Sequence, residues 1–295
     1  MSTLQIVILA IIQGLAELLP VSSSAHVIAA ARLMGIRDTS SPQFTLMLVM
    51  LHTGTMFAVI VYFWRAWMRA FFSSREAFRA FAMQVVLATV VTGIMGLGLK
   101  VVIERYLKHS HPVTLGVDPA TYKAEIEELF SHLELLATSL AAVGVLILYS
   151  GLRSKRRSSH ADIRTGDSLA IGAIQGLCLP FRGFSRSGAT ISVGLLRGMA
   201  RMRLEEFSFA LAVVLTPPVV FLEARRLVHH GQASGTSVGM HDFVPSLIGM
   251  VFSFLAGLVA LKLLSRLLEK GQWWVFGVYC LLAAGGMFAM YRLGY

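Results

Sequence analysis

Two short polar segments interrupt apolar stretches of the sequence, and both carry side chains that could do chemistry. Residues 10–26 read AIIQGLAELLPVSSSAH, and residues 173–190 read AIQGLCLPFRGFSRSGAT. The first offers a carboxylate, three hydroxyls and a histidine, whereas the second offers arginines and hydroxyls among glycines. Polar groups inside apolar membrane segments are costly and commonly mark a functional site. The two segments therefore predict one shared site.

The first segment predicts a helix, a break and a second helix. Gln13 and Glu17 are four residues apart, so they share a helix face. Pro20 ends that helix, and Ser22–Ser24 stand where a new helix needs an N-cap. His26 then falls in the first turn of the second helix.

The simplest explanation differs from residue to residue in this segment. The serines alone are explained by helix capping, and a single histidine is more often a core residue than a catalyst. Glu17 is different, because a carboxylate in an apolar segment must be paired, protonated or bound to a metal. His26 gains weight from its spacing, three residues after Ser23 and nine after Glu17.

The second segment favours an anion. Arg186 lies between Ser185 and Ser187 at the predicted start of a helix, with glycines on either side. Helix N–H groups, hydroxyls and a guanidinium fork together suit a phosphate. Two other arrangements are open to Arg186: it could extend to the membrane interface, or it could pair with Glu17.

Together these side chains suit phosphoryl transfer. Glu17 could hold a divalent cation that neutralises phosphate oxygens, and Arg186 could stabilise charge on the transferred group. Either Ser23 or His26 could attack, or His26 could act as a base toward Ser23 or water. A phosphate met at membrane depth implies a substrate with a long lipid tail, and the sequence carries no P-loop signature.

The composition predicts an all-α polytopic membrane protein. The chain has 295 residues, of which 56% are hydrophobic and 14% charged, and its mean hydropathy is +0.69. Six stretches are long and apolar enough to cross a bilayer: 44–64, 81–103, 134–152, 207–228, 243–265 and 273–293.

Tryptophan and tyrosine gather near their ends, as in an aromatic belt: Tyr62, Trp64, Trp67, Tyr149, Trp273, Trp274 and Tyr291. Segments 3–36 and 168–200 are more interrupted, and each is predicted to be a re-entrant helical hairpin.

The chain is predicted to be one integral membrane domain built from two repeats, 1–152 and 168–295. Gln13-Gly14-Leu15 matches Gln175-Gly176-Leu177, and QFTLMLVML at 43–51 resembles EFSFALAVV at 206–214. Each repeat holds one hairpin and three spans, and because three is odd, the second repeat must be inverted relative to the first. Inverted repeats are typical of transporters, with a site near the midplane where the repeats meet.

The net charge of +10 is explained by membrane topology better than by nucleic acid. Loops 65–80 and 153–167 are rich in arginine and are predicted to be cytoplasmic, whereas loop 104–133 is acidic and predicted to be external. Both chain termini then lie on the outer face. Arg225 and Arg226 fall outside and run against this orientation. Partners are therefore a bilayer and a lipid, with no nucleic acid, and a homodimer is left open.

At these residues the chain resembles the undecaprenyl-diphosphate phosphatases, also called bacitracin-resistance proteins. Their first motif places a Glu or Gln four residues before a Glu, followed by PVSS and a histidine. Their second motif, PGxSRSxxT, matches the chain from Gly183 to Thr190, and FSF at 207–209 and LHTGT at 51–55 are also similar. The chain departs at one position, since Arg182 stands where the motif has proline.

The resemblance implies a hydrolase of the bacterial inner membrane that removes the terminal phosphate of undecaprenyl diphosphate and recycles the carrier lipid for peptidoglycan synthesis. It implies dependence on a divalent cation, Mg²⁺ or Ca²⁺, and a site that opens toward the outer face. The expected catalytic residues are Glu17, Ser23, His26 and Arg186, with Glu17 as metal ligand. The expected substrate-binding residues are Gln13, Ser22, Ser185, Ser187 and Thr190.

Two other functions are compatible with these features. A transporter or flippase for an anionic polyprenyl lipid would also use inverted repeats with broken helices, but it would not need Ser23 beside His26. A structural protein could use the hairpin serines and Arg186 to hold helices together, with glycines allowing close packing, but this does not explain Glu17.

Overall fold

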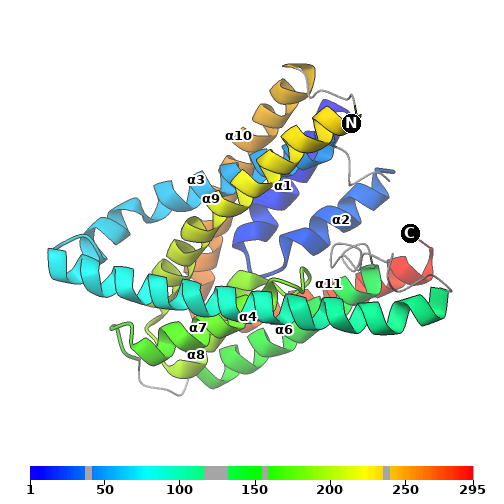
Figure 1. Cartoon of the computed structure of the whole chain (residues 1–295). Helices are drawn as coiled ribbons and strands as arrows, with labels where there is room; N and C mark the ends of the chain where they lie inside the picture. The colour runs from blue at the N-terminus through cyan, green and yellow to red at the C-terminus, as the bar shows by residue number, and fades with distance from the viewer. Residues whose placement is uncertain (37–41, 116–131, 155–158, 235–239, 295) are drawn as a thin grey trace.

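The computed structural model describes residues 1–36, 42–115, 132–154, 159–234 and 240–294, and these residues are almost entirely helical (Figure 1). The helices are α1 (Thr3–Leu18), α2 (Ser23–Leu33), α3 (Pro42–Ala70), α4 (Arg75–Leu115), α6 (Leu133–Ser154), α7 (Thr165–Cys178), α8 (Arg186–Arg197), α9 (Arg201–Ser234), α10 (Met240–Glu269) and α11 (Trp274–Arg292). One isolated β-bridge joins His160 to Met199. The all-α prediction is confirmed for this part of the chain.

Six of these helices are long and apolar enough to cross a membrane. They are Gln43–Ala70, Arg75–Tyr106, Leu133–Ser154, Arg201–Leu222, Phe243–Glu269 and Trp274–Arg292. Each overlaps one of the six predicted spans. Large apolar side chains such as Ile94, Leu97 and Leu282 are more than two-thirds exposed on them. Such a surface is compatible with lipid and unfavourable in water.

The two interrupted segments each form a pair of shorter helices, as predicted. The α1–α2 break covers residues 19–22, and Leu19 is extended because a residue before proline is excluded from the helical region. The α7–α8 break covers residues 179–185. Helix α8 ends at Gly198, whose φ of 84° is a left-handed conformation that glycine adopts without strain.

The shorter helices pack against long helices from the other half of the sequence. Helix α1 lies against α10, and α7 lies against α4 (Figure 1). Glycines make both contacts close: a methyl group at Gly14 would lie 2.5 Å from the Ser253 carbonyl oxygen, and one at Gly176 would lie 2.8 Å from that of Thr92. The two pairings bring the breaks of both interrupted segments toward one another.

The predicted aromatic belt is wrong at two tryptophans. Trp64, Tyr149 and Tyr291 are exposed, as a belt requires. Trp67 and Trp273 are instead buried in the core, where their ring N–H groups donate to internal acceptors. A tryptophan near a helix end can lie either at the membrane interface or in the protein core, because its ring is apolar and its N–H can bond in both places.

Part of the predicted topology signal lies outside the described residues. This applies to Asp118, Glu125, Glu127 and Glu128 of the acidic loop, and to Lys155–Arg157 of the second basic loop. The described basic residues Arg65, Arg69, Arg75 and Arg79 flank the turn between α3 and α4.

Candidate active site

The breaks of the two interrupted segments are in direct contact. The Ser22 hydroxyl donates to the carbonyl oxygen of Arg182 at 3.0 Å. From the other side, the Ser187 hydroxyl donates to the carbonyl oxygen of Leu19 at 3.4 Å. The two breaks are therefore joined by hydrogen bonds in both directions, as one shared site would require.

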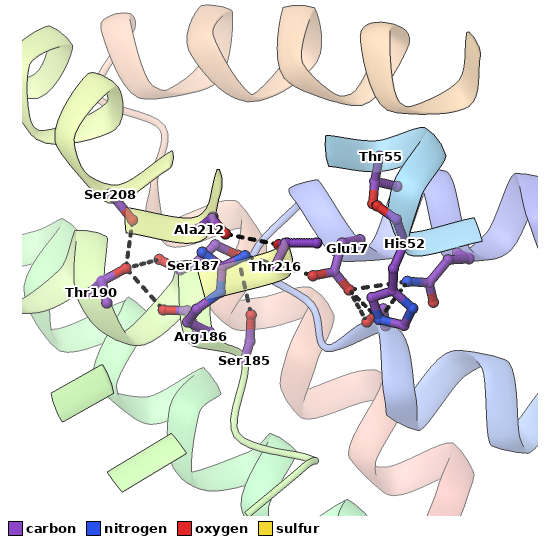
Figure 2. A network of polar contacts seen from close by, with 12 residues as sticks. Glu17, His52, Thr55, Ser185, Arg186, Ser187, Thr190, Ser208, Ala212 and Thr216 are labelled. Carbon is purple, nitrogen blue, oxygen red and sulfur yellow. Dashed lines mark hydrogen bonds and ion pairs between the residues drawn. The ribbon is translucent and has the colours of Figure 1, made fainter. Parts of the chain in front are cut away.

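Glu17 is the centre of the polar side chains at this contact (Figure 2). Its Oε2 accepts hydrogen bonds from the Ser23 hydroxyl at 2.5 Å and from the Gln13 amide at 3.1 Å. The same oxygen lies 3.8 Å from Nε2 of His52. Its other oxygen, Oε1, lies 3.6 Å from Nη2 of Arg186. The carboxylate thus has one oxygen facing the first half of the sequence and one facing the second.

Arg186 lies close to the Glu17 carboxylate, but one nitrogen of its guanidinium has no hydrogen-bond partner among the described residues. It occupies the first position of α8, and Ser185 caps this helix by accepting from the Gly188 N–H at 3.3 Å. Its Nη1 is buried and has no hydrogen-bond partner among the described residues. Buried donors without a partner are uncommon in folded proteins and call for an explanation. An anionic group bound at Nη1 would satisfy this donor.

Ser22 holds an unusual backbone conformation at the tip of the first segment. Its φ is 67° and its ψ is 99°, and it is the one non-glycine residue with positive φ in the described part of the chain. It stands at the N-cap position of α2, but its hydroxyl bonds Arg182 and does not cap the helix. The N-cap position that the sequence places among the three serines thus falls at Ser22, and only side-chain capping, the simplest explanation, does not apply to it. Such strain costs of order 1–3 kcal/mol and is typical of functional sites.

His26 is engaged by residues other than Ser23. Its Nδ1 donates to the Ser22 carbonyl oxygen at 2.8 Å, so Nε2 carries the lone pair of the neutral ring. That nitrogen lies 2.8 Å from the hydroxyl of Tyr279, and the two rings stack with centroids 5.6 Å apart. The Ser23 hydroxyl meanwhile points to Glu17. The structure brings Ser23 and Glu17 together, and it turns His26 toward α11.

Sequence reasoning missed two residues of this site. His52 lies outside both polar segments, in the LHTGT stretch at 51–55 that carries part of the family resemblance. Tyr279 was treated only as part of a span, and nothing in its sequence surroundings separates it from the other tyrosines.

The remaining predicted substrate-binding residues are largely buried and hold the site in shape. Gln13 is almost fully buried and connects Glu17 with His52. The Thr190 hydroxyl is fully buried, at 2.7 Å from Ser208 Oγ and 2.9 Å from the carbonyl oxygen of Arg186 (Figure 2). These contacts fix Gln13 beside the carboxylate and fix the first turn of α8 beneath the guanidinium.

The site could hold a divalent cation only with help from its substrate. No group of three or more His, Cys, Asp or Glu side chains is arranged to bind a metal within the described residues. Glu17 nevertheless provides one carboxylate, and Mg²⁺ is commonly bound by one or two carboxylates together with substrate phosphates. The donor set thus fits a cation shared with a phosphate better than a metal held by protein alone.

Comparison with known proteins identifies the family of this chain. The family model described as bacitracin resistance protein BacA matches residues 6–286. An undecaprenyl-diphosphatase 2 of Acinetobacter baylyi is 53% identical over 97% of this chain and 96% of its own length. Undecaprenyl-diphosphatases of Syntrophotalea carbinolica and Halothermothrix orenii are 32% and 30% identical, over 98% and 95% of this chain. The match contains both polar segments and nearly every described helix, so the chain belongs to the bacitracin resistance protein BacA family.

Proposed function

We propose that this chain is a membrane phosphatase that hydrolyses undecaprenyl diphosphate to undecaprenyl phosphate and inorganic phosphate. The observation that carries the proposal is the approach of Arg186 to Glu17 across the two breaks, with Nη1 of the arginine buried and unsatisfied. A full-length relative at 53% identity is named for this activity. The reaction regenerates the carrier lipid for peptidoglycan synthesis and thereby counters bacitracin.

Ser23 is the nucleophile that the contacts favour. Its oxygen would attack the terminal phosphorus, forming an O–P bond as the bond from phosphorus to the bridging oxygen breaks. The hydroxyl proton would pass to the Glu17 carboxylate, with which the Ser23 hydroxyl already makes a 2.5 Å hydrogen bond. Undecaprenyl phosphate leaves, and water then hydrolyses the phosphoserine to release inorganic phosphate.

His26 remains the alternative nucleophile, since its Nε2 carries a lone pair in the neutral ring. The two routes leave different intermediates. A trapped phosphoenzyme that survives acid indicates phosphoserine, and one that acid destroys but alkali spares indicates phosphohistidine. The same experiment on Ser23→Ala and His26→Ala identifies which side chain carries the phosphate.

Arg186 would stabilise the transferred phosphoryl group. A guanidinium fork can donate two parallel hydrogen bonds to phosphate oxygens, and Nη1 is free for this purpose within the described structure. Because the pair is only partly exposed, its interaction with charge is stronger than in bulk water. Ser187 and Thr190 hold the turn from which this side chain extends.

A divalent cation, Mg²⁺ or Ca²⁺, would be held by Glu17 together with the diphosphate. When bound, it would supply positive charge that offsets the charge developing on phosphate oxygens. Glu17 would then orient the cation through one oxygen while the Ser23 hydroxyl lies against the same carboxylate.

We further propose that the two halves are inverted repeats with re-entrant hairpins, α1–α2 and α7–α8, in one domain of the bacterial inner membrane. Equivalent contacts support this: α1 packs on α10 as α7 packs on α4. Thr53 and Thr216 occupy matching positions, and each donates to the carbonyl oxygen four residues earlier, at 2.7 and 2.8 Å. The arginines beside the α3–α4 turn support a cytoplasmic position for that turn and a site open to the outer face.

Phosphate release from a polyprenyl diphosphate by the detergent-purified chain tests the activity. Release is expected with Mg²⁺ or Ca²⁺ and should stop with EDTA. No release under any divalent cation would reject the phosphatase and leave transport of an anionic polyprenyl lipid, which vesicles containing a labelled lipid would then test.

A further inference from the structure

Gln13 from α1 and His52 from α3 converge on Oε2 of the Glu17 carboxylate. The terminal amide nitrogen of Gln13 lies 3.1 Å from Glu17 Oε2 and 3.3 Å from His52 Nε2. The distance between His52 Nε2 and Glu17 Oε2 is 3.8 Å, which closes the triangle. Arg186 approaches the opposite oxygen, Oε1, and leaves this side to neutral partners.

The spacing of these three atoms leaves room for a small cation among them. A point equidistant from three atoms with these separations lies about 2 Å from each, close to the ligand distances of Mg²⁺ and of first-row divalent metals. A half-turn of the Gln13 amide exchanges its nitrogen for its oxygen at the same place, so all three positions can present lone pairs.

The orientation of His52 is that of a metal ligand. Its Nδ1 donates to the carbonyl oxygen of Leu48 at 2.8 Å, which fixes the lone pair on Nε2, the nitrogen facing Glu17. Metal-binding histidines usually donate their other ring N–H to a carbonyl or carboxylate in this way. His26 makes a similar bond to Ser22, but its Nε2 is occupied by Tyr279.

His52 is also accessible to an ion. Its side chain is 40% exposed and that of Glu17 is 19% exposed, whereas Gln13 is almost fully buried beneath them. An ion could therefore reach the two partly exposed groups and keep an open side toward a phosphate. Figure 2 shows Glu17 and His52 directed toward each other from separate helices.

We propose that His52 is a nitrogen ligand of the divalent cation, completing a site with Glu17 Oε2 and the Gln13 amide oxygen. The inference rests on the proposed function, since the cation would serve the diphosphate reaction. It also predicts metal preference. An imidazole ligand favours Mn²⁺ and Co²⁺ over Ca²⁺, which binds oxygen ligands almost exclusively.

The test is pulsed electron paramagnetic resonance of one equivalent of Mn²⁺ bound to the full, tag-free chain in detergent, with inorganic phosphate in place of the lipid substrate. Nitrogen modulation from a coordinated imidazole is expected. His52→Ala should abolish it and weaken Mn²⁺ binding at least ~10-fold, as removal of groups supporting a metal site commonly does. His132→Ala is the control, because His132 is exposed and pairs with Glu134 instead of Glu17. Nitrogen modulation absent from wild type, or surviving in His52→Ala, would overturn the proposal.

Two further measurements test coordination by His52 even if His52→Ala fails to fold. Histidine labelled with ¹⁵N should change the modulation frequencies of the wild-type protein, and unchanged frequencies would exclude a histidine ligand. His52→Asp supplies an oxygen ligand, so it should retain a bound cation, lose the nitrogen signal and bind Ca²⁺ better relative to Mn²⁺. An unchanged preference would count against a coordinating role.

Failure of this inference and failure of the proposed function are distinguishable. Wild-type chain that releases phosphate with Mg²⁺ but gives Mn²⁺ no nitrogen ligand would reject His52 alone. Chain that releases no phosphate with any divalent cation would reject the phosphatase, whatever the magnetic resonance result.

Discussion

The hydroxyl of Tyr279 lies 2.8 Å from Nε2 of His26, and the two rings stack nearly parallel, with an angle of 14° between their planes. Tyr279 belongs to α11, near the end of the chain, whereas His26 is in the first turn of α2. Since Nδ1 of His26 is held by the Ser22 carbonyl, Tyr279 completes the restraint of the imidazole. The orientation of this histidine is therefore set from both ring nitrogens.

Tyr279→Phe should lower kcat about 10-fold, the lower end of what a positioned acid–base group contributes, and leave KM nearly unchanged. The substitution keeps the stacked ring and removes only the hydroxyl. Steady-state hydrolysis of a polyprenyl diphosphate measures both constants. Tyr291→Phe, at an exposed position of the same helix, is the control. Equal kcat in the two variants would show that the hydroxyl does not restrain a working histidine.

Glu17 and Arg186 should be coupled in stability as well as in activity. Each single alanine variant leaves a poorly solvated charge without its partner. We therefore expect a coupling energy of about 1–3 kcal/mol between the two substitutions, as is usual for residues in contact. The double variant should therefore melt at a higher temperature than additive losses predict, while all three lose at least ~100-fold in turnover. Thermal melting in detergent measures the coupling. Strict additivity would mean that the two side chains do not interact in the folded chain.

Ser22→Gly should be more stable than Ser22→Ala. Both lose the hydrogen bond to Arg182, but only alanine must hold a positive φ with a side chain, which costs of order 1 kcal/mol. Both should lose activity, because the bond that joins the two breaks is gone. Melting temperatures in the reverse order would indicate that the backbone at Ser22 relaxes when its hydroxyl is removed.

The helices could be predicted from the sequence because their signals are local. Span length and the effect of Pro20 on Leu19 each depend on neighbouring residues only. The same signals identified Glu17 and Arg186, since a charge in an apolar segment is conspicuous anywhere in the chain.

The partners of these residues could not be predicted in the same way. His52 and Tyr279 reach the site by tertiary packing of α3 and α11, and their sequence surroundings are ordinary for a span. Ser22 has the sequence of a helix cap, yet its hydroxyl bonds a residue far along the chain. In each case, a long-range contact replaced the local interaction that the pattern favours.

Gly14 and Gly176 should be intolerant of alanine, whereas Gly93 should accept it. A methyl group at either of the first two would meet backbone oxygen at 2.5 or 2.8 Å, so α1 or α7 must shift from its long partner helix. Nothing lies within 4 Å of a methyl group at Gly93, where alanine should stabilise the helix by about 1 kcal/mol. Melting in detergent compares the three, and phosphate release reports whether the breaks still meet. Gly14→Ala and Gly176→Ala should lower both the melting temperature and turnover. Helix α1 contains Glu17, and α7 leads into the break that precedes Arg186. A Gly14→Ala chain with wild-type melting and turnover would show that α1 does not need its close contact with α10 to position the carboxylate.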